Sequence, residues 1–210
     1  MRFRFLFLSL GLGLSLLPCL TAAEVVDRIV AVVDRYAITL TEAERAVELA
    51  RFRGNDALAL SDAVEALIEH RLIEREIKRY PGIQASPEDL RLAVDSLRDS
   101  YPSADDFRRA MELQGLNADG LEQLLKKQLT INLYLERRFR FLVYVTEEEI
   151  QGFYEEELLP ELQASGKELP SRESLEERIR SLLVERKFNE RVNQWIDDLK
   201  SRSRIRRYVW

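Results

Sequence analysis

The chain offers few side chains of the kinds that bind metals or attack substrates. Its 210 residues include one histidine, His70, and one cysteine, Cys19. A zinc site of the usual kind needs several Cys and His ligands, and a relay between two histidines needs a second His. The sequence also lacks glycine-rich phosphate-binding motifs and the catalytic signatures GxSxG and HExxH. We therefore predict no catalytic, cofactor-binding or metal-binding residues.

The remaining polar candidates have simpler structural interpretations. His70 lies between Glu69 and Arg71 in a segment of helical periodicity, which favours a surface or hydrogen-bonded residue over a catalytic base. The acidic runs at 155–157 and 197–198 are typical of a solvated helix face rather than of acid–base catalysis.

The C-terminal tail combines cations with apolar residues. Its members are Arg202, Arg204, Ile205, Arg206, Arg207, Tyr208, Val209 and Trp210. This alternation favours the edge of a β-sheet over a contact with nucleic acid or an anionic surface. We predict a closing strand in this tail and no nucleic-acid partner.

Residues 1–23 have the pattern of a secretory signal peptide. A basic start with Arg2 and Arg4 precedes an uncharged apolar run over 5–17, and small residues end at Ala23. We predict cleavage after Ala23. The alternatives are an uncleaved anchor, for which the run is short of the roughly 20 residues that span a bilayer, and a lipid on Cys19, which the preceding proline disfavours.

Residues 24–210 have the composition of a folded, exported protein without stable membrane insertion. The whole chain is 46% hydrophobic and 33% charged, which argues against disorder. Because two of its 32 Lys and Arg lie in the predicted signal, residues 24–210 carry 30 cations against 37 acids, a net charge of −7. Their length fits one domain or two small ones.

The periodicity predicts a mainly helical fold with a small β-hairpin. Two β-branched runs, 25–33 and 36–40, flank Asp34 and Arg35, which favours a hairpin over a single strand leading into a helix. Helices are expected to begin near Thr41, Ser61, Ser86, Ser103, Asn117, Thr146 and Ser171. The helix over 117–139 is apolar on more than one side and should be central. In the helix over 171–200, Trp195 should lie in the core.

The order of these elements resembles the SurA-type periplasmic chaperones, relatives of the PrsA foldases. The resemblance rests on DRIVAVV at 27–33 with AITLTE at 37–42, LIEHRL at 67–72, FRRAMELQG at 107–115, VTEEEI at 145–150 with Phe153 and Tyr154, and the segments 179–183 and 195–199. It covers nearly all of residues 24–210. It implies one chaperone domain whose N-terminal hairpin pairs with the C-terminal strand.

The chain departs from the family between two helices. Relatives usually carry a parvulin-type prolyl isomerase domain there, whereas this chain has only the segment from Pro160 to Pro170, and a domain seldom folds below about 40 residues. We predict an N-terminal part (24–158), a short linker (159–170) and a C-terminal helix and strand (171–210).

The resemblance implies ATP-independent binding of unfolded or outer-membrane protein clients in the periplasm through an apolar groove, without enzymatic activity. Met111, Leu113 and Leu116 are the predicted client contacts, because apolar and adaptable side chains suit varied partners. The alternative for these three residues is core packing. The alternative functions are a dedicated adaptor subunit of an envelope assembly and a peptidylprolyl isomerase.

Overall fold

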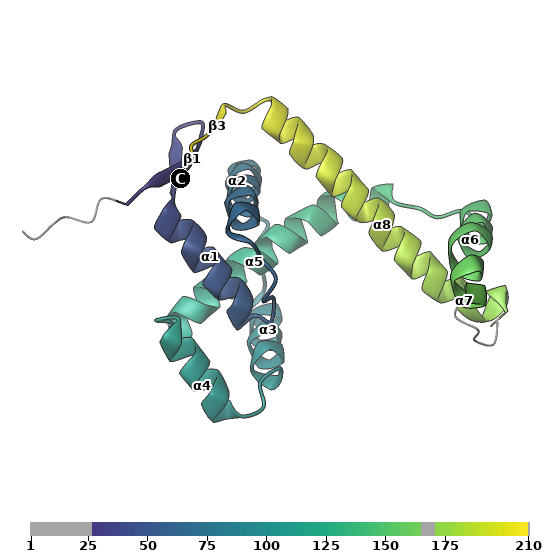
Figure 1. Cartoon of the computed structure of the whole chain (residues 1–210), viewed down its shortest axis with the longest axis horizontal. Helices are drawn as coiled ribbons and strands as arrows, with labels where there is room; N and C mark the ends of the chain where they lie inside the picture. The colour runs from purple at the N-terminus through teal and green to yellow at the C-terminus, as the bar shows by residue number, and fades with distance from the viewer. Residues whose placement is uncertain (1–26, 165–170, 210) are drawn as a thin grey trace, which may run out of the picture.

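Helices build most of the structure, and a small sheet closes it at one end (Figure 1). The structure, a computed structural model, describes residues 27–164 and 171–209, so the predicted signal peptide over 1–23 lies outside the described residues. The elements are β1 (Ile29–Val33), β2 (Tyr36–Thr39), α1 (Leu40–Phe52), α2 (Leu60–Ile77), α3 (Pro87–Asp99), α4 (Ala104–Leu113), α5 (Ala118–Phe139), the short 3-10 helix η1 (Arg140–Leu142), α6 (Glu147–Phe153), a π-helical turn η2 (Tyr154–Leu158), α7 (Leu159–Ala164), α8 (Arg172–Ser201) and β3 (Ile205–Arg207).

Most helices begin where the sequence predicts. Ser86, Ser103, Asn117, Thr146 and Ser171 each accept a hydrogen bond from a backbone N–H of the first turn. The first two helices begin earlier than predicted. The N-cap of α1 is Thr39, not Thr41, because β2 leads directly into the helix and the Thr39 hydroxyl accepts from Glu42 N. The helix α2 begins after Ala59, which supplies no side-chain cap.

The two ends of the described chain meet in one sheet, as predicted. The strand order is β2-β1-β3, and β1 is antiparallel to both neighbours. Val33 of β1 lies opposite Tyr36 of the hairpin and opposite Ile205 of β3. After β3, Tyr208 N donates to Val30 O over 2.9 Å. The mainly helical fold with a hairpin paired to a C-terminal strand is therefore confirmed.

Asp34 connects the hairpin turn to two remote segments. Its φ of 56° is positive, a region that Asp tolerates better than most residues. Its Oδ1 accepts from Arg204 N over 3.0 Å, and its Oδ2 accepts from Arg75 on α2 over 2.5 Å. Arg75 also donates to Ser203 Oγ over 3.0 Å. One carboxylate thus holds the turn, α2 and the entry to β3 together.

Replacing Asp34 with alanine is expected to lower the free energy of unfolding by about 1–3 kcal/mol, because two acceptors are lost and alanine disfavours a positive φ. Urea unfolding measures the change. Asp34→Asn is the matched control, since Asn keeps an acceptor oxygen and tolerates the same backbone conformation. An equal loss in both variants would show that the charge on Asp34, rather than the turn geometry, supplies the stabilisation.

A second link between β3 and α2 depends on pH. Arg207 donates two hydrogen bonds to the Glu65 carboxylate, over 2.6 and 2.8 Å, and these bonds hold the pKa of Glu65 below its ordinary 4.5. The stabilisation is therefore present above pH 4.5 and is lost as the pH falls through the lower folded-state pKa.

We expect Glu65→Gln to lower the free energy of unfolding at neutral pH by less than about 1 kcal/mol, because the pair is partly exposed. The difference from the parent chain should disappear well below pH 4.5, where both side chains are neutral. Denaturant unfolding of both proteins across this pH range measures it. A difference that stayed constant with pH would exclude the ion pair as its cause.

The main core joins segments that are far apart in the sequence. Side chains from the sheet, α1, α2, α5 and α8 pack into one cluster, in which Tyr134 of α5 and Trp195 of α8 have ring centroids 5.9 Å apart. Trp195 is buried, as predicted. The final helix therefore packs among the N-terminal helices.

Two smaller apolar clusters lie outside the main core. One, around Phe52, Phe107 and Leu121, joins α1, α3, α4 and α5. The other, around Ile150, Ile179 and Leu183, joins α6 to the first half of α8. Figure 1 shows α6 and α7 at the end of the molecule opposite the sheet.

The predicted linker is helical in its first part. The chain continues in helical conformation from α6 through η2 and α7 to Ala164, and α8 begins at Arg172, while 165–170 lie outside the described residues. Across the described ranges 27–164 and 171–209, the helices are all too short or too polar to cross a membrane.

Candidate functional site

The joint between α5 and α6 exposes three large apolar side chains close together in the sequence. Phe141 is 77% exposed, Leu142 41% and Tyr144 74%. Phe139, two residues before Phe141, is buried in the main core. The helix α5 ends in the 3-10 turn η1, which contains Phe141 and Leu142, and the backbone is extended at Val143, whose partly buried side chain packs against the main core. We call Phe141, Leu142 and Tyr144 the joint surface.

Arg140 holds the beginning of this joint in place. Its guanidinium donates to both carboxylate oxygens of Glu136, over 2.8 and 2.7 Å, and to Glu185 of α8 over 2.9 Å. It lies 4.4 Å from the ring centroid of Phe188. The hydrogen bonds that Arg140 donates to Glu136, and then the one that it donates to Glu185, raise the pKa of Arg140 above its usual range. The joint is thereby fixed to both α5 and α8.

Lys187 of α8 holds the other end. Its ammonium donates to the backbone oxygen of Tyr144 over 2.9 Å, lies 5.5 Å from the centroid of that ring and pairs with Glu149 of α6 over 2.5 Å. The bond from Lys187 lowers the pKa of Glu149. These contacts fasten the backbone of the joint at both ends.

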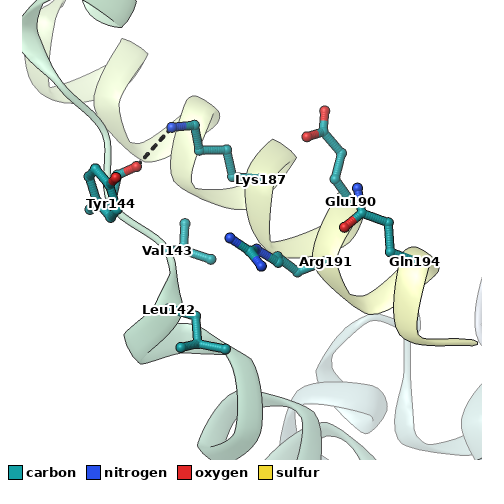
Figure 2. A pocket seen from close by; sticks show the side chains of 7 residues that line it. All are labelled: Leu142, Val143, Tyr144, Lys187, Glu190, Arg191 and Gln194. Carbon is teal, nitrogen blue, oxygen red and sulfur yellow. Dashed lines mark hydrogen bonds between the residues drawn. The ribbon is translucent and has the colours of Figure 1, made fainter.

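A hollow of about 350 Å³ separates the joint from α8 (Figure 2). Leu142, Val143 and Tyr144 form one wall, and the polar side chains of Lys187, Glu190, Arg191 and Gln194 form the other. Figure 2 shows the Arg191 guanidinium directed from α8 towards Val143. One wall can therefore contact apolar groups while the other offers hydrogen-bond donors and acceptors.

A second hollow, of about 430 Å³, lies between α3 and α5 and is mostly apolar. Its lining includes Leu92, Ala93, Leu129 and Leu133, and also Glu136. Since Glu136 bonds to Arg140, this hollow adjoins the joint. Apolar and charged side chains therefore lie close together on the walls of both hollows.

The residues predicted as contacts lie elsewhere. Met111 and Leu116 are half-buried and pack against the cluster around Phe107, with Leu116 N donating to Met111 O over 2.9 Å. Leu113, at the end of α4, is 85% exposed. In Figure 1 α4 lies away from α8 and the joint, so the structure does not bring the three residues together with the joint surface.

Sequence reasoning missed the joint surface for a physical reason. The run FLVYV at 141–145 is apolar and too short for its periodicity to distinguish a buried strand from an exposed segment. A usable signal was its position directly after Arg140, where the long helix ends.

The other polar candidates, His70 and the two acidic runs, lie on helical segments. His70 is half-buried on α2, and burial lowers the pKa of its imidazole. The acidic runs at 155–157 and 197–198 are exposed on helical segments, as predicted.

Comparisons with known proteins agree on one kind of chaperone. No family model matches the chain. Two curated relatives, each named Chaperone SurA, are 26% identical over 145 residues (Pseudomonas putida) and 27% identical over 144 residues (Saccharophagus degradans). The matches cover 65% and 63% of this chain but 34% and 33% of the relatives. The chain thus spans about a third of the length of the curated relatives it matches.

A solved structure shares the fold. It is one of the Campylobacter jejuni proteins PEB4 and Cj1289, which are described as two structurally related SurA-like chaperones. The superposition has a TM-score of 0.56 at 12% identity and covers 88% of this chain and 100% of the other. The resemblance to SurA-type chaperones is therefore confirmed in sequence and in fold.

Proposed function

We propose that this chain is an ATP-independent periplasmic chaperone that binds unfolded proteins through the joint surface and the two hollows beside it. The observation that carries the proposal is the exposure of Phe141, Leu142 and Tyr144 on a joint that Arg140 and Lys187 hold in place. The similarity to proteins named Chaperone SurA supports the same function, and outer-membrane proteins are the clients that the resemblance implies.

The mechanism is weak, reversible burial of client side chains. Covering one exposed aromatic or leucine side chain contributes roughly 1.5–3 kcal/mol, and the association cost removes several kcal/mol of the total. A few such contacts hold an unfolded chain for a short time and then release it without ATP. The cations of the hollow in Figure 2, Lys187 and Arg191, offer polar contacts to client carboxylates and backbone oxygens.

Leu113 provides a second contact in this proposal. Leu113 is exposed at the end of α4, and its half-buried neighbours Met111 and Leu116 pack against the apolar cluster beneath. A client long enough to reach both α4 and the joint would gain affinity by binding at two places.

The proposal includes the absence of prolyl isomerase activity and the division of the chain into 24–158, 159–170 and 171–210. Its support is the short interval between Ala164 and Arg172, which leaves no room for a separate domain. The rate of cis–trans isomerisation of a proline peptide in the presence of the chain measures prolyl isomerase activity. A rate above the uncatalysed one would overturn this part of the proposal.

The decisive experiment dilutes an unfolded outer-membrane protein from urea into buffer without ATP and adds purified residues 24–210. Suppression of aggregation at a near-equimolar ratio is the expected result. Failure to suppress, with a well-folded chain by circular dichroism, would overturn the proposal and favour a dedicated adaptor subunit with a single partner.

A further inference from the structure

The turn end of the sheet carries a concentration of cations from three separate segments. A hollow of about 570 Å³ there is lined by Asp34, Arg35, Tyr36, Arg75, Arg202 and Arg204. A smaller adjoining hollow shares Arg35, Tyr36 and Arg75 and adds Arg71, Glu74 and Lys78. We call this region the basic end. Six cations and two carboxylates line it, in a chain whose formal net charge is −5.

Some of these cations are already neutralised. Arg75 pairs with Asp34 over 2.5 Å, Arg71 pairs with Glu42 over 2.6 Å, and Arg202 pairs with Asp198. These pairs fix the walls of the hollows.

Three cations of the basic end remain uncompensated. Across residues 27–164 and 171–209, Arg35, Lys78 and Arg204 make no ion pair with a carboxylate. All three are exposed. Arg35 lies 5.6 Å from the ring centroid of Tyr36, and its hydrogen bond and charge, with the charges of Lys78 and Arg71, lower the pKa of the Tyr36 hydroxyl. The field at this end is therefore positive.

Two further donors lack an acceptor. Within the described residues, the Nε atoms of Arg71 and Arg75, one turn apart on α2, are buried without a hydrogen-bond partner, although Arg75 Nε lies 3.8 Å from Glu76 Oε1. Buried N–H donors in folded proteins nearly always have one. An anion that entered the hollows from solvent would meet these guanidinium groups as well as the exposed cations.

We propose that the basic end binds phosphate groups, presented either by a lipid headgroup or by a free phosphate compound. The planar fork of a guanidinium donates two parallel hydrogen bonds that match phosphate oxygens. Arg35 from the hairpin and Arg204 from the segment before β3 reach the same hollow because the chain ends meet in the sheet. The tail arginines thus differ in role, since the Arg207 side chain is engaged with Glu65, whereas the Arg204 side chain makes no ion pair with a carboxylate of the described residues and only its backbone N–H donates to Asp34.

The location allows both functions at once. The sheet lies at the end of the molecule opposite α6 and α7 (Figure 1), and neither Arg35 nor Arg204 lines the hollow beside the joint surface. A chain held by its basic end to an anionic surface would leave the joint surface accessible. The inference does not depend on the proposed chaperone function.

The test measures co-sedimentation of residues 24–210 with phosphatidylglycerol vesicles, with phosphatidylcholine vesicles for comparison. In parallel, calorimetry measures binding of inorganic pyrophosphate. The variant R35Q/R204Q removes two exposed cations that make no ion pair, so its fold should be retained, which circular dichroism checks. The control R108Q/R109Q removes the same charge from α4, where Arg108 and Arg109 are also exposed.

The parent chain and the control are expected to bind the phosphatidylglycerol vesicles, and R35Q/R204Q should bind about 30-fold more weakly, since each cation near an anionic surface contributes about 1 kcal/mol. If the parent chain binds pyrophosphate and R35Q/R204Q does not, the result would support the proposal with a free phosphate compound as the ligand. Vesicle binding without pyrophosphate binding supports it with a lipid source. Equal weakening in the control, or no binding in either arm, would overturn it.

Discussion

Replacing Trp195 with alanine is expected to lower the free energy of unfolding by about 3–5 kcal/mol, the range for truncating a large buried aromatic. Trp195 of α8 contacts the rings of Tyr134 and Phe139 on α5, with centroid distances of 5.9 and 5.3 Å. The Arg138 guanidinium lies 5.4 Å from its centroid. The substitution therefore removes the centre of the contact between the C-terminal helix and the long central helix.

Leu182→Ala is the matched control on the same helix. Leu182 is 44% exposed, so its truncation should change the free energy of unfolding by no more than about 1 kcal/mol. Urea unfolding followed by far-ultraviolet circular dichroism measures both variants. Equal effects at the two positions would mean that α8 contributes through its own helical stability and not through its packing against α5.

Much of the fold was predictable because local sequence features determine where most of its helices begin. Caps at Ser86, Asn117 and Thr146 begin helices where a side-chain oxygen satisfies the free N–H groups. The pairing of the hairpin with the tail also followed from the resemblance to SurA-type chaperones. The predicted caps of α1 and α2 were wrong, because β2 leads directly into α1 with Thr39 as the cap, and α2 begins at Leu60, after Ala59, without a side-chain cap.

The candidate site was not predictable in the same way. Exposure depends on how the chain turns after α5, and the sequence of the joint does not determine whether Phe141 points into the core or into solvent. Met111 and Leu116, which stay predicted contacts, are partly buried against the cluster around Phe107, a position that their residue types alone did not indicate. The basic end depends on the meeting of Arg35 and Arg204, which are far apart in the sequence.

The joint surface yields the prediction with the largest effect on function. The double variant F141S/Y144S is expected to weaken client binding about tenfold or more, because two aromatic contacts of roughly 1.5–3 kcal/mol each are lost and only part of each is realised on a mobile client. Stability should be nearly unchanged, since both side chains are more than 70% exposed in the folded chain. A titration of aggregation suppression gives the ratio of chaperone to client at half effect.

Leu113→Ser is the comparison variant that tests the second contact, because Leu113 is also exposed but lies on α4, away from the joint. A smaller loss in this variant than in F141S/Y144S would assign the main contact to the joint and a secondary one to α4. A larger loss in Leu113→Ser would move the principal contact to the set of Met111, Leu113 and Leu116. If neither variant changed the titration, clients would bind elsewhere, and the joint aromatics would have no part in the activity.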